Sequence, residues 1–373
     1  MVREYFPERY KNAMEVLEAL NIQTGRTATV VEETGEIKNR VVNPQFPRSK
    51  TRRKILIFGG LVGGGFVAAM LTKNLWSGTP PEDISSSTTP EPTVSPEAEF
   101  PIQTFTTVKV NSKGEIISQT EGQAEVMTEN LGDGVSLEMV KIPGGRFLMG
   151  SPDTEIQRQT RESPQHYVDV PEFFMGKYLV TQAQWEVVMG NNPSQFQGAS
   201  RPVEKVSWDD AIEFCEKLLD RTGKKYRLPS ESQWEYACRA GTTTPFYFGE
   251  TITPWLVNYN GRYPYGDAPE GEYRKETTDV GIFPPNSFGL YDMHGNVWEW
   301  CQDDWHDSYE DAPTDGSSWK TGGDPKKRAL RGGAWVNLSR YCRSASRTFG
   351  DTDFVVSKRG FRIILSVSVD KKI

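Results

Sequence analysis

Two carboxylates stand seven residues apart in the segment DMHGNVWE, which covers residues 292–299. Asp292 and Glu299 can supply side-chain oxygens, and the glycine-containing backbone between them can supply carbonyl oxygens. Together these are the ligands that a hard cation such as calcium prefers. The same carboxylates can instead accept hydrogen bonds from backbone amides in a tight turn. The segment therefore predicts either a calcium site or a capped turn.

The chain contains four cysteines, which are too few for a disulfide scaffold and lack the C-x-x-C spacing of a structural zinc site. They are Cys215, Cys238, Cys301 and Cys342. Four thiols allow up to two disulfides, and the sequence does not specify the pairs. A lone cysteine is more often a small buried apolar side chain than a reactive group, so both interpretations apply to Cys342.

The elements around these residues are predicted to be many short strands and few helices. The segment TQAQWEVVMG predicts a helix over roughly 181–190, and SWDDAIEFCEKLLDRTG predicts a second over 207–223 with Ser207 as its N-cap. A third short helix is expected after Pro229, ending at Gly241. Few helices among short aromatic-rich strands indicate an α+β domain.

Tryptophan and charge are both informative about the class of protein. Nine of the ten tryptophans lie between Trp185 and Trp335, so one region holds most of the large aromatic core material. We expect Trp234 and Trp298 to be buried there. The formal net charge of -7 argues against binding nucleic acid by broad electrostatic attraction. We therefore expect no nucleic-acid partner.

The N-terminal residues 8–20, ERYKNAMEVLEAL, place apolar side chains at helical spacing and predict one amphipathic helix. The stretch YFPERYKNAMEVLEALN resembles the last helix of a bacterial Ser/Thr protein kinase catalytic domain. No glycine-rich loop, HRD or DFG element precedes it. The resemblance implies a kinase tail without its catalytic part, within a segment that covers residues 1–54. A generic N-terminal helix is the alternative.

Residues 55–72, ILIFGGLVGGGFVAAMLT, carry no charge and are long enough to cross a membrane. The basic run RSKTRRK precedes this span, whereas Lys73 alone follows it closely. The positive-inside rule therefore places residues 1–54 in the cytoplasm and the C-terminal part outside. We expect a single-pass membrane protein that contacts the membrane through one helix. A cleaved signal peptide is the alternative, but the polar chain before the span is too long for one.

Two segments connect the span to the main domain. Residues 73–100 are rich in Ser, Thr, Pro and Glu and predict a flexible linker. Residues 101–135 alternate apolar and polar side chains around Lys113-Gly114 and predict a lead-in hairpin. The main domain is expected over residues 136–367.

Nine sequence blocks follow one another in this main domain. They are MVKIPGGRFLMGS (139–151), ESPQHYV (162–168), VTQAQWEVVM (180–189), RPVEKVSWDDAIEFC (201–215), YRLPSESQWEYACRAG (226–241), NSFGLYDMHGNVWEWCQDDW (286–305), LRGGAW (330–335), CRSASR (342–347) and RGFRI (359–363). Together they resemble the formylglycine-generating enzyme, or sulfatase-modifying factor, family. The resemblance covers roughly 136–367. It implies a C-type-lectin-like α+β fold with little regular secondary structure.

The same resemblance implies a calcium-ion cofactor (Ca2+) with a structural role. The family binds structural calcium within the block that contains residues 292–299. Transferred to this chain, the ligands are the side chains of Asp292 and Glu299 and the backbone oxygens of Gly295 and Val297.

The catalytic chemistry of the family depends on two cysteines in the pattern RGGS-aromatic-x-C-x-x-x-x-C. They bind copper(I), and one of them bonds to the substrate cysteine that becomes formylglycine. Here the segment 331–342 reads RGGAWVNLSRYC, with Cys342 at the second position and Asn337 at the first. An amide cannot replace a thiolate as a ligand for this soft metal, so copper is not expected.

A candidate ligand-binding surface lies among the blocks RGGAW, CRSASR and RGFR. Its apolar, aromatic and small side chains show no helix or strand period. Proteins diversified by retroelements carry variable positions in the same stretch of the lectin-like fold, and ordinary loop drift is the alternative. The candidate residues are Trp335, Val336, Asn337, Leu338, Tyr341, Thr348, Phe349 and Phe354.

Three functions are compatible with these features. The first is a non-catalytic binding or sensing domain outside the membrane, with a protein or small-molecule ligand and a kinase partner in the cytoplasm. The second is a formylglycine-generating-type oxidoreductase that uses Cys342. The third is a purely structural surface protein without a saturable ligand. The missing first cysteine favours the binding domain.

Overall fold

The computed structural model describes residues 100–367. The predicted helix at 8–20, the predicted span at 55–72 and the linker up to residue 99 lie outside the described residues. Within the range 100–367, no helix has both the length and the apolar character needed to cross a membrane.

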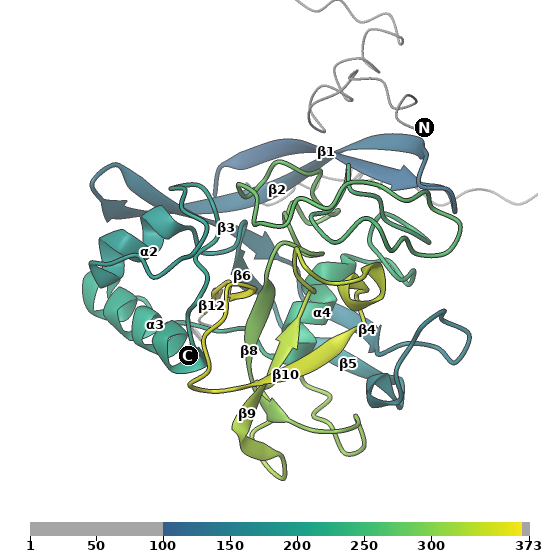
Figure 1. Cartoon of the computed structure of the whole chain (residues 1–373). Coiled ribbons are helices and arrows are strands. Elements are labelled where there is room, and N and C mark those ends of the chain that lie inside the picture. The colour runs from purple at the N-terminus through teal and green to yellow at the C-terminus, as the bar shows by residue number, and fades with distance from the viewer. Residues whose placement is uncertain (1–99, 368–373) are drawn as a thin grey trace, which may run out of the picture. The chain divides into compact units, whose positions relative to one another are not determined.

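Six strands form the main antiparallel sheet, in the order β1-β2-β3-β6-β12-β7 (Figure 1). Their bounds are β1 Ile102–Val110, β2 Ile116–Gly132, β3 Val135–Ile142, β6 Phe173–Gly176, β7 Tyr226–Arg227 and β12 Ile364–Ser366. β1 and β2 make the expected hairpin, and Gly114 adopts a φ of 76° in its turn. Because β2 continues into pairing with β3, the hairpin is part of the domain's own sheet.

A second sheet has the order β10-β9-β8-β11, and β4 pairs with β5 in a separate two-stranded ribbon. The bounds are β4 Gly145–Met149, β5 His166–Val170, β8 Trp298–Trp305, β9 Asp324–Arg331, β10 Arg347–Asp351 and β11 Arg359–Gly360. Two 3₁₀ turns complete the elements, η1 Thr160–Glu162 and η2 Ser339–Cys342. The strands of the second sheet, with the segments before and between them, contain the residues that the sequence identified as functional.

Three helices are present in the described part of the chain, α2 Gln182–Met189, α3 Trp208–Thr222 and α4 Glu231–Arg239. Each begins with a capping box in which Thr181, Ser207 or Ser230 accepts a hydrogen bond from the third backbone amide of its helix. All three predicted helices are therefore confirmed. The third ends at Arg239, two residues before the predicted end at Gly241, because Ala240 takes the left-handed conformation there.

The helices divide between the flank and the interior of the domain. Figure 1 shows α2 and α3 side by side at one flank, and α4 close to β8. The ring of Trp185 in α2 stacks on that of Phe214 in α3, with centroids 5.6 Å apart. Trp234 of α4 and Trp298 of β8 are both buried, as predicted. Mixed sheets with few helices confirm the α+β class.

Candidate functional site

The segment after β9 turns sharply and brings Cys342 back beneath it. Gly332 and Gly333 have φ values of 92° and 77°, which favour glycine. A Cβ atom at Gly333 would lie 2.6 Å from the sulfur of Cys342, so a larger residue would displace the thiol. The turn therefore fixes the position of this sulfur.

Cys342 is fully buried in η2. Burial raises the pKa of its thiol well above the ordinary value, and the nearby backbone amide of Gly295 opposes this shift only weakly. The thiol is therefore protonated at neutral pH. Because the thiolate is the nucleophile and the metal ligand, burial disfavours the reactive form of Cys342.

Asn337 is held by its backbone. Its amide donates to the carbonyl of Ala334 at 2.9 Å, and its carbonyl accepts from the amide of Asn260 at 2.9 Å. Its side-chain oxygen Oδ1 is buried and has no hydrogen-bond partner among residues 100–367. No hydrogen bond to Oδ1 therefore explains why asparagine occupies the position of the first cysteine.

All four cysteines are free and buried, so none of the possible disulfides forms. Cys238 in α4 has its sulfur 3.9 Å from Nδ1 of His294 and 3.7 Å from Oγ of Ser344. Nε2 of His294 accepts from the amide of Tyr247 at 3.1 Å. Burial lowers the pKa of His294 to about 3 and raises that of Cys238 to about 12. Both shifts oppose transfer of a proton from the thiol to the imidazole.

The two predicted calcium-binding carboxylates have different surroundings. Oδ2 of Asp292 accepts from the amide of Gly281 at 2.7 Å, while Oδ1 is buried without a hydrogen-bond partner in the described residues. Both oxygens of Glu299 accept from Arg362, at 2.6 Å and 3.1 Å. The described residues contain no cluster of three or more His, Cys, Asp or Glu side chains that could hold a metal. A site there must therefore use backbone carbonyl oxygens.

The unpartnered oxygen of Asp292 is the observation that fits a cation. A buried carboxylate oxygen without a donor is costly unless something compensates its charge. The adjoining backbone turns through residues with positive φ, at Asp292 (57°), Gly295 (76°) and Asn296 (61°). This geometry is compatible with the predicted set of Asp292, Gly295, Val297 and Glu299. If Glu299 binds a cation, its carboxylate would do so while both of its oxygens also accept hydrogen bonds from Arg362.

Trp335 lies in a partly buried aromatic group. Its Nε1 donates to the carbonyl of Ser357 at 2.9 Å, and its ring meets that of Phe196 edge-on at 5.3 Å between centroids. The ring of Tyr273 lies nearly parallel to it at 6.3 Å. Val336, Leu338 and Tyr341 are likewise partly buried, and the hydroxyl of Tyr341 accepts from Arg340 at 2.9 Å.

The other predicted ligand residues have different neighbours. Thr348 and Phe349 lie on β10, and the ring of Phe349 contacts that of Trp305 at 5.1 Å. Phe354 is exposed, with the guanidinium of Arg359 at 5.4 Å from its ring centre. The structure thus groups Trp335 with Phe196 and Tyr273, whereas it groups Phe349 with Trp305.

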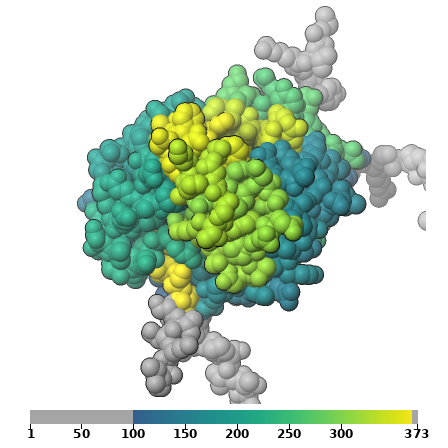
Figure 2. Space-filling model, turned by 90° about the horizontal axis from the view of Figure 1, so that it is seen from below, coloured from purple at the N-terminus to yellow at the C-terminus, as the bar shows by residue number. Residues whose placement is uncertain are grey.

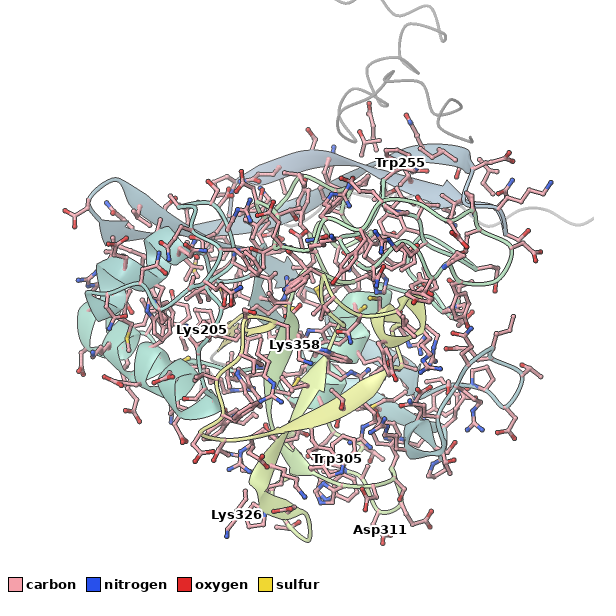
Figure 3. The ribbon with its side chains drawn as sticks, viewed as in Figure 1. Lys205, Trp255, Trp305, Asp311, Lys326 and Lys358 are labelled. Atoms are coloured by element: carbon pink, nitrogen blue, oxygen red, sulfur yellow. The ribbon has the colours of Figure 1, made fainter. Side chains whose placement is uncertain are left out.

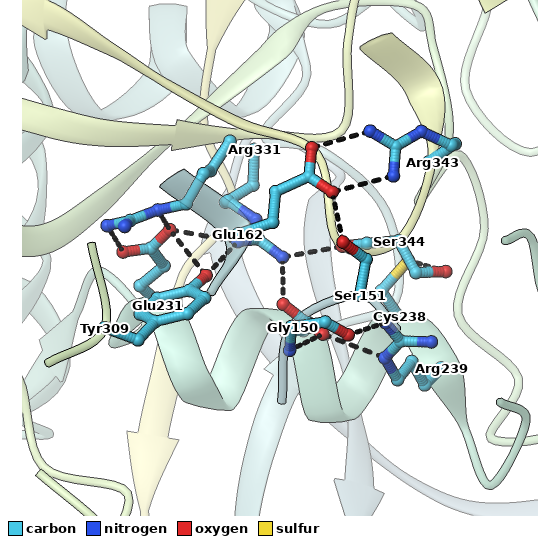
Figure 4. Close-up of polar contacts among 12 residues, drawn as sticks. Gly150, Ser151, Glu162, Glu231, Cys238, Arg239, Tyr309, Arg331, Arg343 and Ser344 are labelled. Carbon is cyan, nitrogen blue, oxygen red and sulfur yellow. Dashed lines mark hydrogen bonds and ion pairs between the residues drawn. The ribbon is translucent and has the colours of Figure 1, made fainter. Parts of the chain in front are cut away.

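A buried ionic cluster fastens β9 and β10 to α4 (Figure 4). Glu231 of α4 accepts from Arg331 of β9 at 2.9 Å and from Arg347 of β10 at 2.6 Å and 2.7 Å. Glu235 accepts from Arg331 at 2.5 Å and from Arg239 at 2.9 Å. The pairs of Arg331 and Arg347 were missed from the sequence, because partners about a hundred residues apart leave no spacing signal.

A second buried pair continues this cluster toward the N-terminal part of the domain. Both oxygens of Glu162 accept from Arg343, at 2.6 Å and 2.8 Å, and Ser151 donates to Glu162 at 2.7 Å. Arg343 directly follows Cys342, so this pair anchors the end of the turn that holds the buried sulfur. The arginines of the CRSASR block are therefore structural.

The sequence comparisons agree with this architecture. The family described as "Sulfatase-modifying factor enzyme 1-like domain" matches residues 124–367, which is more than half of the chain. The chain belongs to this family. The predicted resemblance to formylglycine-generating enzymes is thereby confirmed.

Similar proteins include enzymes, a protein kinase and a solved structure. Formylglycine-generating enzyme of Mus musculus is 31% identical over 292 residues, covering 60% of this chain and 74% of the relative. Serine/threonine-protein kinase pkn1 of Chlamydia pneumoniae is 31% identical over 260 residues, covering 62% of this chain and 38% of the kinase. The solved structure of PvdO from Pseudomonas aeruginosa has a TM-score of 0.57 at 32% identity, covering 65% of this chain and 98% of PvdO. The kinase match agrees with the predicted kinase similarity.

Proposed function

We propose that this sulfatase-modifying factor domain is a non-catalytic ligand-binding or sensing module. The observation that carries the proposal is the pair of residues at the cysteine positions of the family. Asn337 occupies the first position, and Cys342 at the second is a buried, protonated thiol. Copper(I) chemistry requires soft thiolate ligands, and this arrangement offers one buried thiol where the family has two.

A copper(I) titration of the full chain, purified in detergent, tests this proposal. Oxygen consumption is followed in the presence of a sulfatase-type cysteine peptide. We expect no tight copper binding and no peptide-dependent oxygen uptake. Tight binding with oxygen uptake by the unmodified chain would contradict the proposal.

The substitution Asn337→Cys provides a gain-of-function arm for the same experiment. It restores the two-cysteine pattern while the turn at Gly332 and Gly333 is unchanged. We expect this variant to bind copper(I) more tightly than the matched control Asn337→Ser, which has a similar size but no thiol. If both variants bind copper equally, the asparagine is not the reason for the missing copper site.

The second candidate function is an oxidoreductase that uses Cys342. It is favoured by one observation, the retention of a cysteine at the second position of the pattern. Activity of the unmodified chain that disappears in Cys342→Ala and persists in Cys215→Ala would establish it. Both thiols are buried, so the comparison controls for the loss of a buried sulfur.

A structural calcium ion is part of the proposal. Asp292, Glu299 and the carbonyl oxygens of Gly295 and Val297 would hold it, and the unpartnered Oδ1 of Asp292 supports this. Calcium there would tie the turn before β8 together. Chelation should then lower the unfolding temperature of the full chain, and added calcium should restore it. An unfolding temperature that chelator leaves unchanged would remove the calcium site from the proposal.

The proposed module is outside the membrane and is anchored by residues 55–72. The uncharged span and the basic run before it support this placement. Its ligand would be a protein or small molecule on that side, and a kinase would be the cytoplasmic partner through residues 1–54. Protease treatment of intact cells should degrade the C-terminal domain, whereas protection of that domain would reverse the proposed orientation.

A further inference from the structure

A pocket of about 610 Å³ lies at the end of β8 and beside β9. It is formed by the loop after β8, the loop before β9, and Phe349 of β10. Figure 3 places Trp305 and Asp311 at this end of the molecule, opposite the β1 hairpin. Figure 2 looks at the same end from below, where residues of the 300–330 range occupy the centre of the face. This pocket does not contain Cys342, Asn337 or the predicted calcium ligands.

The charges that line the pocket are unbalanced. Four carboxylates face one ammonium group, and they belong to Asp307, Glu310, Asp311, Asp324 and Lys327. Lys327 pairs with Asp324 at 2.9 Å. The other three carboxylates form no ion pair with any residue in the range 100–367. The lining therefore carries an excess of negative charge that a cationic ligand would neutralise.

Aromatic rings form the apolar part of the lining. Trp319 stacks on the imidazole of His306 at 3.4 Å between centroids, and both His306 nitrogens lie 3.0 Å from backbone carbonyl oxygens. The imidazole is thus fixed in position. Phe349 is 38% exposed and lies against Trp305. Aromatic faces attract ammonium and guanidinium groups, and Lys327 already places its ammonium 4.9 Å from the ring of Phe349.

The carboxylates do not converge on one point. No group of three or more His, Cys, Asp or Glu side chains in the described part of the chain is close enough to hold a metal ion. Charges that are spread along the loop after β8 and the start of β9 match an extended ligand with several cationic groups better than a single ion. The volume is also in the usual range for organic ligands, about 300–1,000 Å³.

We propose that this pocket binds an extended peptide of another protein through its lysine or arginine side chains. The carboxylates of Asp307, Glu310 and Asp311 pair with the cationic groups, and the rings of Trp319 and Phe349 contact their alkyl stems. The inference rests on the binding role proposed above and gives that role a ligand class. It involves no residue of the copper experiment, so the two can fail separately.

Binding of fluorescein-labelled tetralysine amide to the full chain in detergent tests the inference by fluorescence anisotropy. We expect saturable binding that weakens when the salt is raised from about 50 to about 300 mM, because salt screens exposed charges. Glu310→Gln combined with Asp311→Asn removes two of the charges at unchanged size. We expect this double variant to raise Kd about tenfold. Phe349→Ala should raise Kd about threefold through loss of the ring.

The matched control is Glu216→Gln combined with Asp220→Asn. It removes the same charge from exposed positions on α3, outside the pocket. A Kd equal to that of the unmodified chain in this control supports the pocket, whereas an equal loss in both double variants would attribute binding to net charge and overturn the inference. No saturable tetralysine binding would also overturn it. Competition with unlabelled spermidine distinguishes a peptide ligand from a free polyamine. If spermidine displaces the labelled peptide at a lower concentration than unlabelled tetralysine does, the site binds a free polyamine and the peptide proposal is rejected.

Discussion

The buried cluster around Glu231 and the pocket beside Trp305 both gather charged side chains, but they compensate them differently. In the cluster, Glu231 is bound by Arg331 and Arg347, and all three are buried. In the pocket, Asp307, Glu310 and Asp311 form no ion pair among the described residues, although Asp307 interacts electrostatically with Arg161 and Lys327. Both regions adjoin β9 and β10. The difference indicates that the cluster stabilises the fold, whereas the pocket has charge available for a ligand.

The largest expected effect comes from breaking the cluster. Glu231→Ala leaves Arg347 buried without its carboxylate and should lower the free energy of unfolding by about 5 kcal/mol. Denaturant unfolding of the full chain measures this change. Glu213→Ala is the control, because its pairing with Lys217 is exposed and should contribute less than about 0.5 kcal/mol. Equal losses in both variants would mean that burial of the cluster adds nothing.

Next in size is the removal of the ring that lies beneath this cluster. Trp234 is fully buried, and the guanidinium of Arg331 lies 5.2 Å from its ring centre. Trp234→Ala should lower the free energy of unfolding by about 3–4 kcal/mol through the cavity that it leaves. Trp255→Ala, at a ring that is 44% exposed, should change it by much less, about 1 kcal/mol. A similar loss at both positions would contradict the assignment of Trp234 to the core.

Acidification should weaken the cluster in a defined direction. Burial alone would raise the pKa of Glu231, but Arg347 and Arg331 outweigh it and hold the pKa below its ordinary value. Glu235 is shifted in the same direction, with burial outweighed by Arg239 and Arg331. Their stabilisation is therefore present above the ordinary glutamate pKa of about 4.3. It is lost as the pH falls through the lower pKa of the folded protein.

Unfolding free energies measured between pH 7 and pH 3 test this direction. The Glu231→Ala variant should lose less stability on acidification than the unmodified chain, because it lacks one of the two carboxylates. A parallel decline in both proteins would show that other groups set the acid sensitivity.

The smallest effect is expected in the pocket. Glu310→Gln combined with Asp311→Asn should leave the free energy of unfolding within about 0.5 kcal/mol of the unmodified value. Asp311 has a φ of 62°, a conformation that asparagine also accepts. Thermal unfolding of the two proteins side by side measures the change. A decrease of more than about 2 kcal/mol in the free energy of unfolding would mean that these carboxylates stabilise the loop and are not free to bind a ligand.

Local signals in the sequence predicted much of the fold. Ser207 and the acidic residue three positions later predicted the start of α3, and the capping box confirms it. The nine successive blocks predicted the family, and the aromatic content predicted the burial of Trp234 and Trp298. These predictions are confirmed because helix caps and helical spacing depend on residues that are close in sequence, and because large aromatic side chains are usually buried.

Contacts between segments that are distant in sequence could not be predicted from the sequence. Nothing in the spacing of Glu231 and Arg347 reveals their ion pair, and Cys238 lies beside His294 only because α4 packs near the turn before β8. The proposed ligand surface shows the same limit. Trp335 and Phe349 are fourteen positions apart in sequence, but the turn into η2 and β10 gives them separate sets of neighbours.

The β1 hairpin has a mechanical consequence. Among the strands of residues 100–367, β1 pairs only with β2, and its first pair is Ile102 with Glu125. Its far end is fastened, since the amide of Val110 donates to the carbonyl of Phe248 at 2.9 Å. Tension that reaches the domain through the chain before Phe100 therefore acts first on the start of β1. A pulled domain should peel open there and extend by a few residues before its ionic cluster bears any load.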